Sequence, residues 1–366
     1  MRRSPITALM LVAATALLHG QDQHFQEKAG FDLEAQHYFN QGDAFYDAGA
    51  MESAAEYYAA AIEADPQHTK ALYNLALTHF QLKNYGKTEV ALEKLFQLNP
   101  ADTAAYELYG HTQLQQGHAS RAVECFNLLL QYKPTDARFV HRAMANIRTR
   151  HTNDALHDFD EALRLNPQNF EASLGKGIVL MELEQPKLAA AWLEKALSIR
   201  HGDAAALTNL GIIKYQLGEK TEAMEAFREA LWSSRQGETF LARARCYLLD
   251  HNYSDAIADA REAMLIDGDN AEVYAFIGDV EADKGILNDA IESFGIAIDI
   301  NPSHTNYYLR RAGACIKANR CHDAVADLYR ALDLEPYNPE ARALLQTAYR
   351  HIDADVMGES LSKSRH

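Results

Sequence analysis

A small residue recurs along most of this chain at a nearly constant interval. From Gly42 onward, the successive intervals are 34, 34, 33, 34, 34, 33, 34 and 34 residues. The members of this series are Gly42, Ala76, Gly110, Ala143, Gly177, Gly211, Ala244, Gly278 and Ala312. Two further series, which begin at Ala54 and Ala61, keep the same phase. Such a period indicates tandem repeats, each of which buries its apolar face only against its neighbours.

Each period favours two helices and no strand. Ala, Leu, Glu, Gln and Arg are abundant, and all of them are good helix formers. Small residues that recur in phase let two antiparallel helices pack closely. A polar turn such as Asp47-Ala48-Gly49 separates the helices of one repeat. Six second helices are predicted to end at a proline, because proline cannot continue the hydrogen-bond ladder: Pro66, Pro100, Pro134, Pro167, Pro302 and Pro336.

The repeat resembles that of the tetratricopeptide-repeat (TPR) family. The third repeat carries the family's residues at Tyr106, Tyr109-Gly110, Ala122, Phe126 and Pro134, and the eighth at Tyr274, Ile277-Gly278, Ala290, Phe294, Ala297 and Pro302. The resemblance implies nine repeats over residues 35–338, wound into a right-handed superhelical solenoid. Residues 339–352 are expected to form a capping helix, and residues 353–366 a disordered tail.

Three repeats depart from the family pattern at their ends. His201, Arg235 and Gly268 stand where the other repeats carry the terminating proline. One residue is also missing before the fourth and the seventh repeats. We expect a change of superhelical curvature, or a hinge, at these places.

The first twenty residues have the layout of a secretory signal peptide. A basic start, Arg2-Arg3, precedes an apolar stretch from Ile6 to Leu18, and Gly20 is a small residue suited to cleavage. Residues 1–20 are therefore predicted to be removed, and residues 21–34 to form a lead-in to the repeats. The mature chain would then carry no membrane span. A periplasmic location is favoured, with secretion or the endoplasmic-reticulum lumen as the alternative.

The resemblance also implies where partners bind. In the TPR family the first helix of each repeat lines a concave groove, and the relevant positions lie three before, one after and four after the small residue. An apolar stripe of this kind favours a protein or peptide partner, although single residues could pack between helices instead. The predicted groove residues are Tyr46, Tyr73, Leu77, Phe80, Leu114, Met144, Ile147, Ile178, Met181, Ile212 and Tyr215. The Lys/Asn pair with which cytosolic co-chaperones of the family clamp a carboxylate is absent from these positions.

Other classes of function have little support in the sequence. The net charge of −16 and the lack of a Lys/Arg run argue against nucleic-acid binding. No phosphate-binding loop, nucleophile elbow or zinc-type His pair occurs, so we expect no catalytic residue, no metal and no cofactor. Asn252-Tyr253-Ser254 fits a glycosylation acceptor. Cys315 and Cys321 flank one predicted turn, where a disulfide could form in an oxidising compartment.

Three functions remain open. The first is an exported scaffold or adaptor that assembles envelope or secretory-compartment complexes through its groove. The second is a co-chaperone or assembly factor that holds unfolded clients. The third, an accessory to an enzyme or a fragment of a repeat-bearing transferase, has no residue in its favour. A homo-oligomer is compatible with all three.

Overall fold

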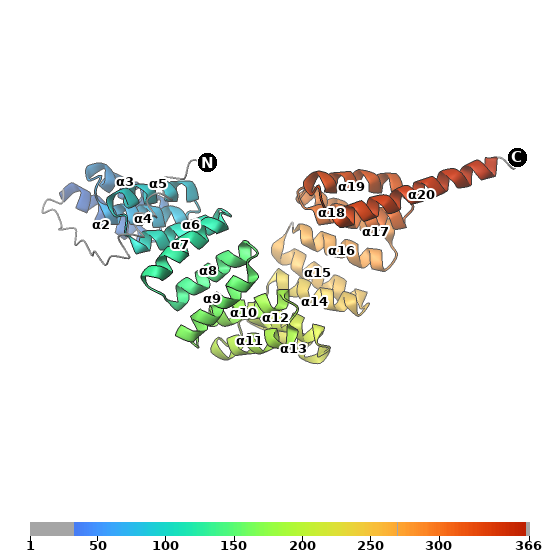
Figure 1. Ribbon diagram of the computed structural model, residues 1–366, viewed down its shortest axis with the longest axis horizontal. Helices are drawn as coiled ribbons and strands as arrows, with labels where there is room; N and C mark the ends of the chain where they lie inside the picture. Colours follow the sequence, from blue (N-terminus) through green and yellow to red (C-terminus); the bar gives the residue numbers. More distant parts are fainter. Residues whose placement is uncertain (1–32, 269, 364–366) are drawn as a thin grey trace. The chain divides into compact units, whose positions relative to one another are not determined.

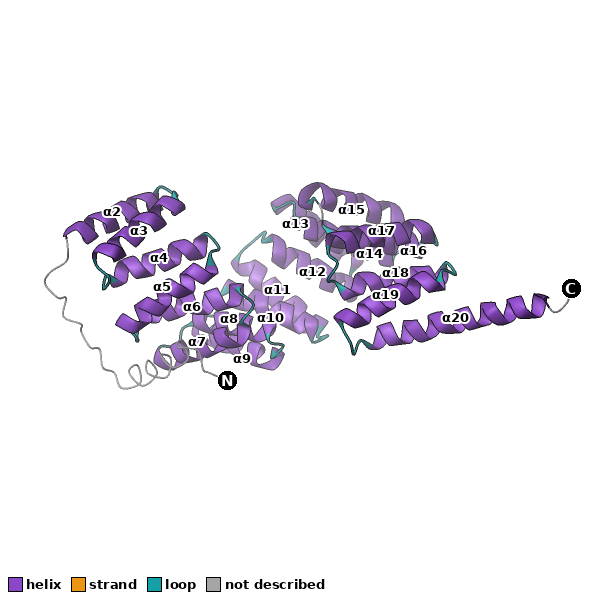
Figure 2. Ribbon diagram, turned by 90° about the horizontal axis from the view of Figure 1, so that it is seen from above, coloured by secondary structure: helices purple, strands orange, loops and turns teal. Residues whose placement is uncertain are grey.

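The computed structural model describes residues 33–268 and 270–363, with side chains as far as residue 353, and all regular structure in this part of the chain is helical (Figures 1 and 2). Nineteen helices follow one another, which fits about nine repeats and a last helix. Their bounds are α2 Leu33–Asp47, α3 Met51–Ala64, α4 Thr69–Gln81, α5 Tyr85–Leu98, α6 Thr103–Gln115, α7 Ala119–Tyr132, α8 Asp136–Arg148, α9 Thr152–Leu165, α10 Phe170–Glu182, α11 Pro186–Ile199, α12 Ala204–Gln216, α13 Lys220–Ser233, α14 Gly237–Leu249, α15 Tyr253–Asp267, α16 Ala271–Asp283, α17 Leu287–Ile300, α18 Thr305–Lys317, α19 Cys321–Leu334 and α20 Pro339–Lys363.

The small-residue series form the contact between the two helices of each pair. All members of the three series are buried. The residue sixteen positions after the first-series residue packs onto it from the second helix. A Cβ added to Gly211 would lie 2.8 Å from the Phe227 ring, and one added to Gly278 would lie 2.8 Å from the Phe294 ring. Glycine therefore makes room for a ring, which confirms the packing role predicted for this series.

Every turn inside a helix pair contains a residue in the left-handed backbone region. In four turns this residue is a glycine: Gly49, Gly117, Gly218 and Gly285. In the other five it carries a side chain: Lys83, Arg150, Glu184, His251 and Asn319. These positions repeat with the same period as the small residues, and a left-handed residue is a common way to end a helix and reverse the chain.

The turns between repeats are shaped by proline and by helix caps. Lys133, which precedes Pro134, has the extended conformation that a following proline imposes (φ −150°, ψ 103°). The next first helix then begins with a capping side chain, as where Asp102 Oδ1 accepts from the Ala105 amide at 3.0 Å. In the seventh repeat, which lacks the proline, α15 runs to Asp267 and ends at Gly268 with φ 61°.

The chain divides into two compact units after Ile199. Unit 1 contains α2 to α11, with one apolar cluster around Phe96 and Phe126 and another around Phe159. Unit 2 contains α12 to α20, with clusters around Phe227, Phe276 and Leu328. The division falls beside His201, where the terminating proline is missing.

The last helix extends further than expected, and the state of two cysteines was left open by the sequence. Helix α20 begins at Pro339 as expected, but its backbone remains helical past Ile352 to Lys363, where the sequence predicted disorder. Ala354 to Lys363 contain no proline, and helix formers such as Met357, Glu359 and Leu361 allow the helix to continue. The disulfide that the sequence left open between Cys315 and Cys321 is not formed, and both residues are buried thiols, as are Cys125 and Cys246. Buried in apolar surroundings, they serve as small apolar side chains.

The predicted signal peptide and most of the lead-in lie outside the described residues. Among the helices of the described part, none is long and apolar enough to span a bilayer. The same part of the chain contains no group of three or more His, Cys, Asp or Glu residues placed to hold a metal ion.

Candidate protein-binding surface

The first helices of successive repeats lie next to one another within each unit. In unit 1, α4 contacts α6 and α8 contacts α10, and in unit 2, α12, α14, α16 and α18 follow in contact. Ten of the eleven predicted groove residues keep solvent exposure in these helices. Leu114 is the exception: it is buried in the apolar cluster of unit 1. The prediction that Leu114 lines an open surface is therefore not met.

Four predicted residues form a partly exposed apolar surface on two neighbouring first helices of unit 1. Met144 and Ile147 lie on α8, and Ile178 and Met181 occupy the equivalent positions on α10. Met144 is 49% exposed, and the other three are partly exposed. We refer to these four residues as the α8/α10 patch. Because methionine adapts its side chain and neither Met nor Ile needs a polar partner, the patch suits an apolar segment of another protein.

The three predicted residues of α4 are also partly exposed and contribute to the core as well. Tyr73, Leu77 and Phe80 pack against the apolar cluster built around Phe96 and Phe126. Burial also raises the pKa of the Tyr73 hydroxyl. These residues therefore stabilise the second repeat as well as presenting part of their surface.

A polar group separates these two apolar surfaces. His111 of α6 and His141 of α8 meet edge to face, with 4.3 Å between their ring centroids. Burial lowers the pKa of both imidazoles, that of His141 to about 4. Beside them, Arg138 pairs with Glu107 at 3.3 Å. The apolar stripe predicted along the groove is therefore interrupted here.

Two of the three tyrosines among the groove residues have polar partners. The Tyr46 hydroxyl accepts a hydrogen bond from Gln81. The Tyr215 hydroxyl donates to Asp250 Oδ1 at 2.6 Å, and Lys220 binds the same carboxylate. Tyr46 thus links α2 to the end of α4, and Tyr215 links α12 to the turn that follows α14. Tyr215 and Ile212 both pack against the apolar cluster around Phe227.

Unit 2 presents a polar cavity on its first helices. The cavity, of about 400 Å³, is lined by residues of α12 and α14 and by the start of α16. Arg245 pairs there with Glu272 at 2.5 Å, and Thr208 bonds to Thr239 at 2.7 Å. Farther along, Arg310 pairs with Asp279 at 2.8 Å, while burial raises the pKa of that carboxyl to about 6. The inner face of unit 2 is therefore more polar than the α8/α10 patch.

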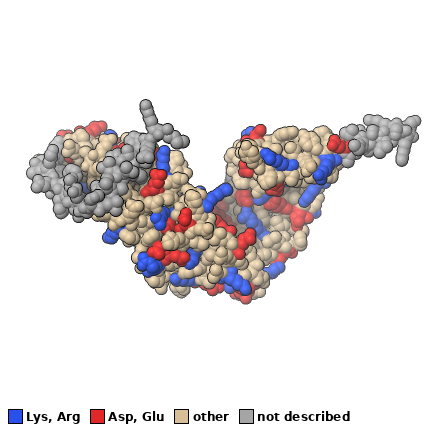
Figure 3. Space-filling view, viewed as in Figure 1, with Lys and Arg blue, Asp and Glu red and all other residues tan. Residues whose placement is uncertain are grey.

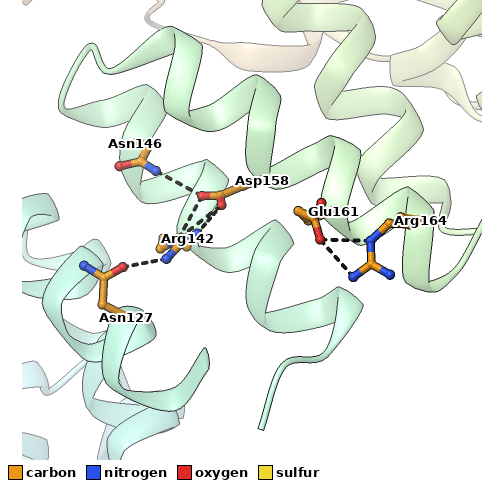
Figure 4. Close-up of polar contacts among 6 residues, drawn as sticks. All are labelled: Asn127, Arg142, Asn146, Asp158, Glu161 and Arg164. Atoms are coloured by element: carbon orange, nitrogen blue, oxygen red, sulfur yellow. Dashed lines mark hydrogen bonds and ion pairs between the residues drawn. The ribbon is translucent and has the colours of Figure 1, made fainter. Parts of the chain in front are cut away.

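The structure contains a set of buried ion pairs that were not predicted from the sequence. Arg142 binds Asp158 through Nε at 3.0 Å, and Asn127 and Asn146 complete the network (Figure 4). The same kind of pair forms between Arg243 and Asp259 and between Arg311 and Asp327. In each pair the aspartate follows the arginine by sixteen residues. All three arginines directly precede an alanine of the first series. That recurrence is the sequence signal that could have predicted the pairs.

These observations define an all-helical repeat solenoid. Family models described as tetratricopeptide repeat match residues 26–69, 39–87, 79–147, 142–204 and 204–232, which together exceed half of the 366 residues. The chain belongs to the tetratricopeptide-repeat family.

Similar proteins cover different shares of the chain. Anaphase-promoting complex subunit 3 of Schizosaccharomyces pombe is 21% identical over 272 residues, which are 64% of this chain and 41% of that protein. DnaJ homolog subfamily C member 3 of Gallus gallus is 21% identical over 362 residues, which are 93% of this chain and 67% of that protein. The crystal structure of yeast Tom70 aligns with a TM-score of 0.55 at 13% identity, over 96% of this chain and 89% of that one. At this identity the structural likeness shows the fold alone.

Proposed function

We propose that this protein is a non-enzymatic scaffold that binds an apolar segment of a partner protein on the first helices of unit 1. The observation that carries the proposal is the α8/α10 patch, where Met144 stands 49% exposed in a register that other repeats fill with polar or half-buried residues. An amphipathic helix or an extended peptide would cover this surface without leaving a buried charge. Membership of the TPR family supports the same general role.

The patch is tested by placing charges in it. The variant Met144→Glu with Ile178→Glu should lose a partner that the natural protein captures from its own cell extract, because a carboxylate buried against an apolar segment has no counter-charge. Leu188→Glu is the matched control, since Leu188 is 54% exposed on a second helix of the same unit. Equal capture by the double variant and the control would exclude the patch as the binding surface.

We further propose that the protein is exported and assembles complexes of the envelope or the secretory compartment. The basic and apolar layout of residues 1–20 supports this. The test is to express the full chain in its natural host and determine the N-terminal residue by mass spectrometry. A mature chain that begins at Gln21 in an exported fraction agrees with the proposal, and an intact Met1 in the cytosolic fraction contradicts it.

A second candidate function is that of a co-chaperone for unfolded clients. It is favoured by the relative that carries the DnaJ name and matches 93% of this chain. Here the same patch would bind many sequences weakly. Suppression of the aggregation of a reduced, unfolded protein such as α-lactalbumin would support it, provided that the Met144→Glu/Ile178→Glu variant loses the effect. A dedicated adaptor would show no suppression.

A further inference from the structure

One register of the second helices is polar in every repeat except two. The register lies twenty-one residues after the first-series residue and faces solvent throughout the described repeats. Seven repeats place a polar side chain there: Glu63, Gln97, Gln131, Arg164, Ser198, Asp299 and Asp333. Repeats six and seven instead place Trp232 and Leu265, which are 89% and 80% exposed. Exposed apolar side chains mark an interaction surface where they lie together in one patch.

Trp232 and Leu265 belong to one surface of unit 2. Their preceding neighbours, Leu231 and Met264, both pack against the same apolar cluster, so the two residues that follow point outward together. An ion pair between Arg235 and Glu262 joins the end of α13 to the last turns of α15. Arg235 lies three residues after Trp232, and Glu262 lies three residues before Leu265.

The charge beside this surface is also particular to the two repeats. One turn before Trp232 and Leu265, on the same helix faces, stand Arg228 and Arg261. No other repeat has a basic residue at this register, where the others carry Ala59, Glu93, Asn127, Asp160, Glu194, Gly295 and Tyr329. Arg228 is exposed and only loosely paired with Glu225, at 3.7 Å. Two arginines beside two apolar side chains are complementary to carboxylates beside apolar side chains.

We infer that Trp232, Leu265, Arg228 and Arg261 form a second docking surface, which binds an acidic segment of a protein partner that carries large apolar side chains. The partner's apolar side chains would cover Trp232 and Leu265, and its carboxylates would pair with the two arginines. We call these four residues the outer patch. The outer patch lies on second helices of unit 2, so it is independent of the α8/α10 patch of unit 1.

Two other occupants fit the outer patch less well. A symmetric contact between two copies would place two Arg228 and two Arg261 side chains in one small interface. An anionic membrane presents a continuous negative surface, which Glu222, Glu225 and Glu229, exposed on α13, would repel. A protein segment can instead place single carboxylates at the arginines and keep its uncharged residues beside the glutamates.

The protein's own tryptophans provide the readout. The sequence contains two tryptophans, Trp192 and Trp232. In a Trp192→Phe background, the emission of Trp232 should shift to shorter wavelength when a short helical peptide of Leu and Glu covers it. A peptide in which Lys replaces every Glu is the control for charge. The shift should saturate with the Glu peptide and be much weaker with the Lys peptide.

Substitutions by side chains that occupy the same register in other repeats distinguish a loss of binding from a loss of folding. Leu265→Gln uses the side chain of Gln97, and Arg228→Glu with Arg261→Asp uses those of Glu93 and Asp160, so each should leave helix content unchanged. Each is expected to weaken Glu-peptide binding by about tenfold or more, since hot-spot losses have that size. The arginine variant should also favour the Lys peptide, whereas Met144→Glu/Ile178→Glu should bind the Glu peptide normally.

Several results would overturn the inference. The absence of a shift with the Glu peptide, measured on folded protein, would do so, and so would equal affinity of both peptides. A shift with phosphatidylserine vesicles but with neither peptide would make the outer patch a lipid contact. Dimerisation in sedimentation equilibrium that Trp232→Gln abolishes would make it a contact between copies.

Discussion

At the scale of single residues, the pairing of glycine with a ring and of alanine with a smaller side chain governs how closely each helix pair packs. Gly110, Gly211 and Gly278 face a phenylalanine sixteen residues later, whereas Ala76 and Ala312 face Leu92 and Leu328. Two pairs depart from this rule. Gly177 faces Leu193, and Ala143 faces Phe159, which also lies against Gly175 of the next repeat.

The substitution Gly211→Ala should therefore destabilise unit 2 by about 1–3 kcal/mol, the cost of an extra methyl group in a packed core. Adding Phe227→Leu should recover part of the loss, because it recreates the combination of Ala76 with Leu92. Urea denaturation followed by circular dichroism measures both effects. A double variant less stable than Gly211→Ala alone would contradict this account of the pairing.

The buried ion pairs make a second prediction. Asp259 is 5% exposed and binds Arg243 through both oxygens at 2.8 Å. Asp259→Ala leaves the guanidinium without its counter-charge and should lower the free energy of unfolding by about 3–5 kcal/mol. Glu225→Ala removes an exposed partner of Arg228 and should change it by less than about 1 kcal/mol. Similar losses in both variants would show that the recurring pairs are not stabilising.

At the scale of elements, five of the turns within helix pairs hold a non-glycine residue in the unfavourable left-handed region. Lys83 has φ 58° and an exposed side chain, while Gly218 occupies the same position in repeat six with φ 83°. Lys83→Gly should raise the stability of unit 1 by about 1 kcal/mol, because the left-handed region costs a side-chain-bearing residue roughly that amount. Gly218→Ala should lower that of unit 2. Thermal melts of both variants check the two signs, and a loss on Lys83→Gly would refute the argument.

The contact between α6 and α8 should respond to acid. The pKa of His141 lies near about 4, because burial, His111 and Arg138 oppose its protonation, although Glu107 favours it. In the unfolded chain a histidine has a pKa of about 6.5, so unfolding takes up a proton between these values. The stability due to neutral His141 is complete above about pH 6.5 and is lost as pH falls towards about 4.

His141→Gln should therefore flatten the pH dependence of unfolding by up to about 1.4 kcal/mol per pH unit within this window. Denaturation of the natural protein and the variant at pH 7, 5.5 and 4.5 measures the difference. His157→Gln, at an exposed position of α9, is the control substitution. Parallel curves for the natural protein and His141→Gln would contradict the prediction.

Sequence alone predicted the elements well and the surfaces less well. The helix pairs followed from Gly42, Ala54, Ala61 and their successors, because packing distance depends on the size of single residues at fixed positions. The exposure of Leu114 could not be predicted, since it depends on how α6 packs into its cluster. The polar interruption at His111 and His141 depends on the register between neighbouring repeats. By contrast, Trp232 and Leu265 could have been found by comparing each register across all repeats.

At the scale of the whole molecule, the division after Ile199 predicts two units that fold separately. Repeat arrays are stabilised by neighbouring contacts only, so cutting at the division removes fewer interactions than a cut within a unit. Residues 33–199 and 200–363, expressed apart, should each be helical and unfold cooperatively on heating. A cut after Leu249, between α14 and α15, is the control and should lose cooperativity. A fragment 200–363 without a cooperative transition would disprove separate folding.

The alkylation rates of the four cysteines can report local unfolding of the repeats. Cys125 lies in unit 1, and Cys246, Cys315 and Cys321 lie in unit 2, all at most 5% exposed. Burial raises the pKa of the Cys246 and Cys315 thiols to about 11 and that of Cys125 well above its usual value. The thiolate is the reactive form of cysteine. Alkylation at neutral pH therefore requires a local opening in which the helix pair separates and water reaches the sulfur. The rate at which each cysteine is modified therefore measures how often its own repeat opens, without any engineered probe.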